Sequence, residues 1–318
     1  MRKNIYVSTE EMSLREFLCT TCLFFNRVSV DDFAAKNRIL VGEDVCTDLS
    51  RVLQPGTQVT LLTPQSFEPW VDEQVGVLFE DDFLLVLNKP APLPMHPAGR
   101  HYFNTLTSVL ERHHGHTKAL YPVQRLDRET SGVVVIAKTA ETASQLAKQF
   151  RKNTVRKEYI AVLRGSLTPP LGVFDGALSK QRVGEIRDHM VIADDGLPSV
   201  TGYEALAATG DYSVVLARPE TGRRHQIRAH FAHAGFPLVG DKQYGGHPDL
   251  FVQFMKDADS VSEEELRENF GAVRHLLHAW KLHFRHPHSG LEMTFVAPLP
   301  SEITSFCEKK GLSLAKLD

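Results

Sequence analysis

The chain has 318 residues, of which 42% are hydrophobic and 24% charged, proportions that exclude a mainly disordered or collagen-like protein. At about 150 residues per domain, this length indicates two domains. The formal net charge of −3 excludes a protein that is basic along its whole length, although a local basic surface could still bind nucleic acid. No apolar run approaches the ~18 residues of a membrane span, and the first residues lack the apolar centre of a signal peptide. We therefore expect a cytoplasmic protein without membrane contact.

Residues 1–64 have the pattern of a small α+β module. Ser13 and Ser29 each open a capping-box spacing, which predicts two helix starts. Strand-like sequence follows at 38–41 and, across a Pro-Gly turn, at 53–61. The order helix, helix, I-L-V-G strand and L-x-P-G-x-x-V strand resembles the S-four type of RNA-binding module. The second helix of that module usually carries several basic residues, whereas here two aspartates stand near its start, so a module that only packs remains the alternative.

Residues 65–79 are expected to form a linker, and residues 80–318 a second domain. Apolar runs predict strands, and capping residues with helical periodicity predict helices. The expected strands are 83–87, 133–136, 159–163 and 212–217, and the expected helices are 104–115, one from Thr139 and one from Ser262. Since strands outnumber helices and do not alternate with them regularly, we predict the α+β class rather than a doubly wound sheet.

The net charge hides an uneven distribution. Residues 148–157 contain five bases and no acid, and residues 218–242 contain five bases against two acids, together with three histidines. Residues 255–270 carry six acids against two bases. Clustered bases suit a local phosphate site, because phosphate affinity grows with the local number of contacts, although solvated helix faces produce the same pattern. In the second basic run, Gly222 and a helix start place backbone N–H groups beside the arginines, which favours an anion site.

A polar turn stands directly before the expected strand 133–136. It reads Gln124-Arg-Leu-Asp-Arg-Glu-Thr-Ser-Gly132, with Asp127 between two arginines. A nearby guanidinium lowers the pKa of a carboxyl group and keeps it ionised, so Asp127 could act as a nucleophile or base. A salt-bridged structural turn gives the same pattern, and the residues alone leave both interpretations open.

The segment Arg125-Leu-Asp127-Arg-Glu-Thr-Ser-Gly132 resembles the R-L-D-x-x-T-S-G signature of RluA-type pseudouridine synthases. Four more blocks resemble motifs of this family and occur in the family's order. They are Leu87-Asn-Lys-Pro90 with Met95-His-Pro-Ala-Gly-Arg100, Lys157-Glu-Tyr159, Glu220-Thr-Gly-Arg-Arg-His-Gln-Ile-Arg228 with Pro237-Leu-Val-Gly-Asp-Lys-Gln-Tyr-Gly245, and Leu277-His-Ala-Trp280 with Ala297-Pro-Leu-Pro300. The resemblance covers roughly residues 78–302, and five ordered blocks are far more specific than one.

The resemblance implies an isomerase that converts uridine to pseudouridine in structured RNA, such as a stem-loop of rRNA or tRNA. The family breaks the N–C glycosidic bond and rejoins the base through carbon 5, without a cofactor or metal, and its members are mostly monomers. Its fold has a central, largely antiparallel mixed sheet. By resemblance, Asp127 is the catalytic carboxylate, Tyr159 stacks on the uracil and shuttles a proton, and Arg228 pairs with Asp127.

The target base must leave its stack to reach Asp127. The resemblance implies that Arg125 takes the place of that base, since a planar guanidinium can stack and donate hydrogen bonds. The other side chains expected to face the RNA are Arg223, Arg224, Lys152 and Arg156 at phosphates, and His96 and Arg100 along the same cleft. One departure is Gln124, which stands where the family often has a histidine and which cannot titrate.

Cysteine and histidine patterns were weighed as metal sites. Cys19 and Cys22 have the spacing of half a zinc site, but no second cysteine pair exists, and a helical reading turns both toward the core. The histidine clusters at 113–116 and 283–288 lack acidic or cysteine partners at ligand spacing, so we interpret them as surface histidines. We expect no metal.

Two alternatives belong to other functional classes. A non-catalytic RNA-binding protein or RNA chaperone of the same fold would not need Asp127, Tyr159 and Arg228 together. A glycosidase could use Asp127 as its nucleophile, but such enzymes normally need a second carboxylate, and the sequence shows none at an obvious partner position.

Overall fold

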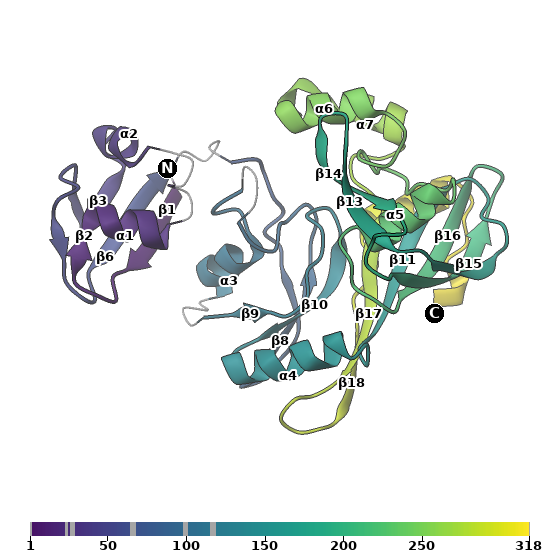
Figure 1. Cartoon of the computed structure of the whole chain (residues 1–318), viewed down its shortest axis with the longest axis horizontal. Coiled ribbons are helices and arrows are strands. Elements are labelled where there is room, and N and C mark those ends of the chain that lie inside the picture. Colours follow the sequence, from purple (N-terminus) through teal and green to yellow (C-terminus); the bar gives the residue numbers. More distant parts are fainter. Residues whose placement is uncertain are drawn as a thin grey trace. The chain divides into compact units, whose positions relative to one another are not determined.

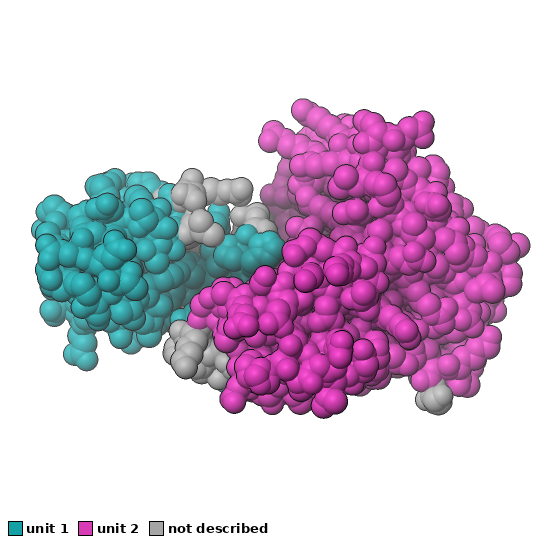
Figure 2. All heavy atoms as spheres, turned by 60° about the horizontal axis from the view of Figure 1, so that its bottom comes forward, with its two compact units in different colours: residues 1–71, 96–115 teal, residues 72–95, 116–318 magenta. Residues whose placement is uncertain are grey.

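A computed structural model describes residues 2–22, 25, 29–63, 68–97, 101–114 and 119–317. The chain divides into two compact units (Figure 2). Unit 1 comprises Met1–Val71 and His96–Gly115, and unit 2 comprises Asp72–Met95 and His116–Asp318. Residues 96–115, which the sequence analysis grouped with the second domain, thus belong to the same compact unit as the N-terminal residues.

In unit 1, the described residues form two small antiparallel sheets and three α-helices (Figure 1). Its strands are β1 (Arg2–Val7), β2 (Met12–Ser13), β3 (Ile39–Val41), β4 (Asp44–Val45), β5 (Val52–Leu53) and β6 (Gln58–Thr63), and its helices are α1 (Leu14–Thr21), α2 (Val30–Ala35) and α3 (Leu106–His114). The larger sheet has the order β1-β6-β3-β4. In the segment 53–61, the expected Pro-Gly turn lies between β5 and β6, and an alternating strand follows it, as predicted.

Both helix starts predicted for unit 1 are present. The hydroxyl of Ser13 accepts the N–H of Glu16, and the hydroxyl of Ser29 accepts the N–H of Asp32, each over 3.2 Å. The expectation that both cysteines of α1 face the core is wrong for Cys19, which is exposed, whereas Cys22 at the end of the helix is buried.

Unit 2 consists of one large sheet, a separate hairpin and five α-helices (Figure 1). The strands are β7 (Gly76–Glu80), β8 (Leu84–Lys89), β9 (Tyr121–Pro122), β10 (Ser131–Ala137), β11 (Arg156–Arg164), β12 (Leu171–Asp175), β13 (Leu178–Val183), β14 (Ile186–Ile192), β15 (Val200–Ala208), β16 (Tyr212–Pro219), β17 (Leu277–Arg285) and β18 (Glu292–Val296). The helices are α4 (Ala140–Arg151), α5 (Gln226–His233), α6 (Pro248–Lys256), α7 (Glu263–Phe270) and α8 (Ser301–Lys309), with 3-10 turns at Ala258–Ser260 and Ala315–Leu317.

The large sheet has the order β12-β15-β16-β11-β17-β10-β8-β7, with β18 beside β17 and β9 beside β10. Among the described pairings, only β10 with β17 is parallel. The predicted α+β fold with a central, largely antiparallel mixed sheet is therefore confirmed. β13 and β14 form a separate hairpin.

Helices α5 and α8 cover opposite faces of strand β11. Ile160 and Val162 belong to the apolar cluster that contains residues of α8, whereas Ala161 and Leu163 belong to the cluster that contains Phe231 of α5. Alternate residues of a strand point to opposite faces. Tyr159, which also packs against the second cluster, therefore lies on the face that α5 covers.

One histidine interpreted as a surface residue is buried. His286, in the second histidine cluster, is 4% exposed, and its Nε2 lies 2.9 Å from a carboxylate oxygen of Asp81. His283, in the same cluster, is half-buried, and its Nδ1 is hydrogen-bonded to the Thr294 hydroxyl. In the first cluster, only His113 has a described side chain.

Within the described part of the chain, no helix is both long and apolar enough to cross a membrane.

Candidate active site

The turn around Asp127 is placed by the strand that follows it. Gly132 has φ +112°, and a Cβ atom there would lie 2.1 Å from the carbonyl oxygen of Ala279, so only glycine permits this approach of β10 to β17. Gly132 pairs with Ala279 from one side of β17, and Tyr159 of β11 pairs with the same Ala279 from the other. The sheet thus brings the Asp127 turn and Tyr159 to one point.

Asp127, Arg228 and Asp241 form a buried ion network. Nη1 of Arg228 donates to Oδ2 of Asp127 over 2.8 Å, while Nε and Nη2 of Arg228 donate to the two oxygens of Asp241 over 2.7 and 2.9 Å. The side chains of Arg228 and Asp241 are 8% and 0% exposed, but that of Asp127 is 21% exposed. Asp127 is therefore the carboxylate of this network that a substrate can reach.

Asp127 is ionised at neutral pH. Burial raises the pKa of its carboxyl group, but His225, Arg228 and His275 outweigh burial, and the pKa lies well below its usual value. Burial lowers the pKa of His225 to about 4 and that of His275 to about 3, so both rings are neutral at pH 7. The guanidinium of Arg228 is then the cation that keeps Asp127 charged.

Tyr159 keeps its hydroxyl proton over the physiological pH range. Burial, followed by the negative charge of Asp127, raises the pKa of Tyr159 well above its usual value. A neutral phenol beside an ionised carboxylate can donate or relay a proton, and its ring offers an apolar face to a base.

A second buried ion pair holds the far end of the turn. Nζ of Lys242 donates to Glu129 over 2.9 Å, and burial is outweighed by Lys242 and other cations, so the pKa of Glu129 is well below its usual value. The Thr130 hydroxyl lies 2.8 Å from Nε2 of His275, and Arg274 donates to the Glu129 carbonyl over 2.9 Å. These contacts join the turn to the segments before β17 and after Gly240.

The Asn-Lys-Pro segment at the end of β8 fixes the middle of the turn. Lys89 is fully buried, and its ammonium group donates to the carbonyls of Pro90, Leu93 and Arg128 over 2.9, 2.8 and 3.4 Å. The side-chain amide of Gln124 donates to the Val133 carbonyl over 3.0 Å, which links the two ends of the turn. Gln124 therefore acts through the shape of the turn, and no contact joins it to Asp127 among the described residues.

Five of the residues expected to contact RNA lie on the surface of unit 2. Arg125 is exposed and forms no ion pair with any residue that the structure describes. The remaining arginines and lysines of this set are also exposed; they are Arg223, Arg224, Lys152 and Arg156. Of these, Arg224 pairs with Asp188 over 3.2 Å. Arg100 lies outside the described residues, and His96 is an exposed residue of unit 1, so its place beside Asp127 stays a prediction.

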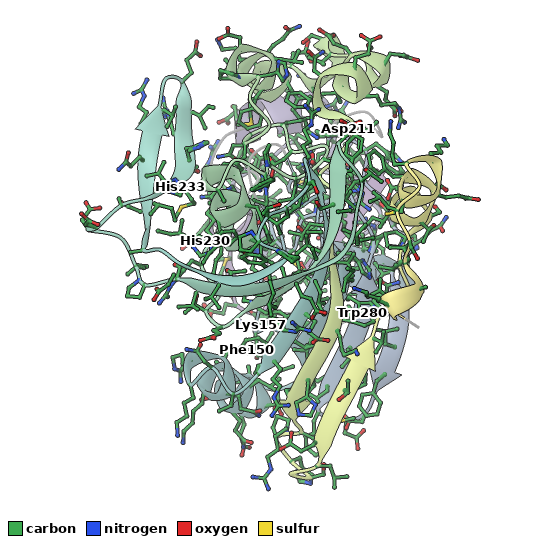
Figure 3. The ribbon with its side chains drawn as sticks, turned by 90° about the vertical axis from the view of Figure 1, so that its right-hand side faces the viewer. Phe150, Lys157, Asp211, His230, His233 and Trp280 are labelled. Carbon is green, nitrogen blue, oxygen red and sulfur yellow. The ribbon has the colours of Figure 1, made fainter. Side chains whose placement is uncertain are left out.

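The two basic runs of the sequence meet in space. Nζ of Lys157, at the start of β11 (Figure 3), donates to the carbonyls of Thr221 and Glu220 over 2.8 and 3.4 Å. Lys157 of the first basic run therefore contacts the turn 220–224 of the second, and four other basic side chains of the first run are exposed. They are Lys148, Arg151, Lys152 and Arg156.

Sequence reasoning missed the roles of several buried or half-buried polar residues of the site, and for His225 it predicted only support of the arginine-rich turn. Most of them lie in the five sequence blocks that resemble family motifs. There, a charged residue next to a glycine or an apolar run was the pattern that could have indicated a buried polar role. They are Lys89, Glu129, His225, Asp241, Lys242, Tyr244 and His275. Gly240, for example, has φ +79°, and a Cβ there would lie 1.8 Å from the Arg274 carbonyl, so this glycine places Asp241 beside Arg228.

Comparisons with known proteins identify the family of the chain. Residues 83–233 match the family model described as RNA pseudouridylate synthase. The chain is 31% identical to the uncharacterized RNA pseudouridine synthase YlyB of Bacillus subtilis, over 96% of this chain and 97% of that protein. It is 32% identical to ribosomal large subunit pseudouridine synthase D of Escherichia coli K12, over 89% and 86% of the two chains.

A solved structure, human RNA pseudouridylate synthase domain containing 4, is similar with a TM-score of 0.59 and 28% identity. The match covers 75% of this chain and 94% of that one. The fold and the full-length sequence similarity lead to the same assignment as the motif blocks. This chain belongs to the RluA-type family of RNA pseudouridine synthases.

Proposed function

We propose that this protein isomerises uridine in ribosomal RNA and that Asp127 is its catalytic carboxylate. The observation that carries the role of Asp127 is the asymmetry of the buried network, in which one carboxylate is partly exposed and the other is fully used by Arg228. The name of the Escherichia coli relative supports ribosomal RNA over transfer RNA. We further propose a cytoplasmic monomer that needs neither cofactor nor metal.

The reaction breaks the bond between N1 of uracil and C1′ of ribose and forms a bond from C5 to C1′. The C5 hydrogen leaves and N1 gains a proton, so the reaction is balanced without a co-reactant. Asp127 must be ionised to attack carbon or to remove a proton, and Arg228 maintains that charge. Tyr159, protonated and on the same face as α5, is suited to move a proton at the displaced base.

The basic surface formed by residues 148–157 and 220–224 is proposed to bind phosphates around the target nucleotide. Arg125, exposed at the start of the catalytic turn, is proposed to fill the space that the extruded uridine leaves.

The N-terminal unit is proposed to be an RNA-binding accessory module. Its helix α2 is followed by Lys36, which is exposed, and Arg38, so replacing both by alanine should raise the KM for RNA without lowering kcat.

A glycosidase has less support. Asp241 could have supplied the second carboxylate, but it is fully buried and both of its oxygens accept from Arg228. It is therefore unable to serve as an acid–base partner for a substrate.

The experiment is to incubate the purified protein separately with ribosomal and transfer RNA made with uridine tritiated at C5. Tritium release with pseudouridine in ribosomal RNA is expected, and Asp127→Asn serves as the negative control. Release only from transfer RNA would overturn the substrate. Free uracil as the product would revive the glycosidase, and binding without release would support an RNA chaperone.

A further inference from the structure

His225 lies beside the oxygen of Asp127 that Arg228 leaves free. Oδ2 of Asp127 accepts the hydrogen bond from Arg228, whereas Oδ1 accepts none from the described residues and lies 3.8 Å from Nε2 of His225. The His225 side chain is only 9% exposed. The protonation of this ring therefore decides whether Oδ1 faces a donor or a lone pair.

The other ring nitrogen of His225 is bound to Tyr244. Nδ1 of His225 lies 3.1 Å from the Tyr244 hydroxyl, and the backbone N–H of Met190 donates to the same hydroxyl over 3.0 Å. A backbone N–H can only donate, so the Tyr244 oxygen accepts there and its own proton is available for Nδ1. Nδ1 then accepts, and a neutral ring carries its proton on Nε2.

The carboxylate favours the same tautomer independently. With the proton on Nδ1, the lone pair of Nε2 would face the negative Oδ1 of Asp127, which is repulsive. With the proton on Nε2, an N–H faces that oxygen. Two neighbours on opposite sides of the His225 ring thus select one tautomer.

The surroundings also fix the ring and keep it neutral. The guanidinium carbon of Arg228 lies 5.1 Å from the centroid of the Tyr244 ring, and the His189 ring lies 4.5 Å from it. Burial and then Arg228 lower the pKa of His225. His225 begins α5 with φ +52°, a conformation that costs energy for residues other than glycine and is concentrated at functional sites.

We propose that Tyr244 and His225 are positioning residues that form a hydrogen-bond relay to Asp127. In this relay the Met190 N–H donates to the Tyr244 hydroxyl, and that hydroxyl donates to Nδ1 of His225. The neutral His225 ring then points its Nε2–H at Oδ1 of Asp127. This inference rests on the proposed catalytic role of Asp127. The relay orients the reactive oxygen without adding a second positive charge, which would make the carboxylate a weaker nucleophile and base. The distance of 3.8 Å shortens to a hydrogen bond when RNA closes the site, as catalytic hydrogen bonds commonly do.

The tautomer can be read directly by two-bond ¹H–¹⁵N correlation spectra of histidine-labelled protein. The His225 signals are those that vanish in His225→Asn, a variant that tolerates the positive φ because asparagine adopts it readily. At pH 7 we expect an unprotonated Nδ1 and a protonated Nε2. A protonated Nδ1, or a doubly protonated ring, would overturn the relay whatever the activity.

Kinetics give a second, independent test. Tyr244→Phe removes one hydroxyl and is expected to lower kcat about tenfold, the loss typical of one hydrogen bond, with an unchanged KM for RNA. His225→Asn should lower kcat similarly, and the double variant should lose no more than either single one, because both break the same relay. Unchanged kcat in Tyr244→Phe, or losses that multiply in the double variant, would contradict the proposal.

A purely structural role for Tyr244 would not produce this pattern. It would lower the unfolding temperature and leave the tautomer of His225 unchanged, whereas the relay predicts that Tyr244→Phe raises the fraction of the Nδ1–H tautomer, because only Asp127 then selects against it. The spectrum of the native protein shows which tautomer His225 adopts even if Tyr244→Phe does not fold. An active Asp127→Asn would refute the proposed function itself, while the His225 tautomer would still stand as measured.

Discussion

Two arginine–aspartate pairs in this protein are both bidentate, but one lies in solvent and the other is buried. Arg15 donates to both oxygens of Asp31 over 3.1 and 2.5 Å, and Arg228 donates to both oxygens of Asp241 over 2.7 and 2.9 Å. The Arg15 and Asp31 side chains are 51% and 66% exposed, whereas those of Arg228 and Asp241 are 8% and 0% exposed.

The difference in burial changes what each pair does. In water, the attraction in the first pair is screened and replaceable. In the second pair the charges have lost their hydration, and the guanidinium is shared with a third group, Asp127. One arginine therefore maintains both the local structure and the charge of the candidate catalytic residue.

The largest effect on the folded protein is expected from Arg228→Met. It leaves two buried carboxylates without their cation, so the free energy of unfolding should fall by about 3–5 kcal/mol and activity should be lost. Urea denaturation and tritium release measure the two effects. Arg228→Lys keeps the positive charge but not the planar set of donors. Compared with Arg228→Met, it should therefore recover more of the stability than of the activity. A stable, active Arg228→Met protein would remove the contrast between the two pairs.

Acid should weaken the buried site next. Burial lowers the folded-state pKa of His225, His275 and His278 to about 4, 3 and 4, below the unfolded value of about 6.5. The unfolded chain then binds more protons below pH 6.5, so the stability that these neutral rings contribute is present above that pH and is lost as pH falls through the window down to about 3.

The carboxyl groups of Asp127, Glu129 and Asp241 act in the same direction at lower pH. Their pKa values are lowered by cations that outweigh burial, so they stabilise the fold above about pH 4 and this contribution is lost below it. Urea denaturation from pH 7.5 to 4.5 should show a falling free energy of unfolding. A flat profile over that range would contradict the assignment of neutral buried histidines.

Smaller effects are expected at the exposed bases. Lys152→Ala and Arg156→Ala should each raise the KM for RNA a few-fold without changing kcat, and each should lower the slope of log KM against log salt by about one. Lys256→Ala, from the acidic segment, is the matched control and should change neither quantity. Equal effects from all three would mean that the basic surface does not bind phosphate.

The smallest effect is expected from Arg15→Ala. The pair with Asp31 is exposed to solvent, so thermal unfolding should not change measurably. A clear loss of stability would show that exposure is a poor guide to the value of an ion pair in this protein.

Much of this site followed from local sequence patterns. The Asp127 turn, the Val-rich strand after it and the helix starts at Ser13 and Thr139 depend on neighbours in the chain, and such patterns are visible in one sequence. The pairing of Arg228 with Asp127 was expected only from family resemblance.

The rest depends on contacts between distant residues. Asp241 joins the network because Gly240 approaches the Arg274 carbonyl, and the Tyr244–His225 bond needs the Met190 hairpin beside α5. No spacing in the sequence encodes these approaches. The surface assignment of His286 was wrong for the same reason, because its partner Asp81 is 205 residues away in the sequence.

The central claim is that the partly exposed, ionised carboxylate of Asp127 carries out the isomerisation. The most direct test is single-turnover tritium release from ribosomal RNA by Asp127→Asn, with RNA binding measured on the same sample. We expect the rate to fall at least about a thousandfold while RNA affinity and folding are retained, since the amide keeps the shape of the carboxylate but not its charge. Release at the native rate would contradict the claim.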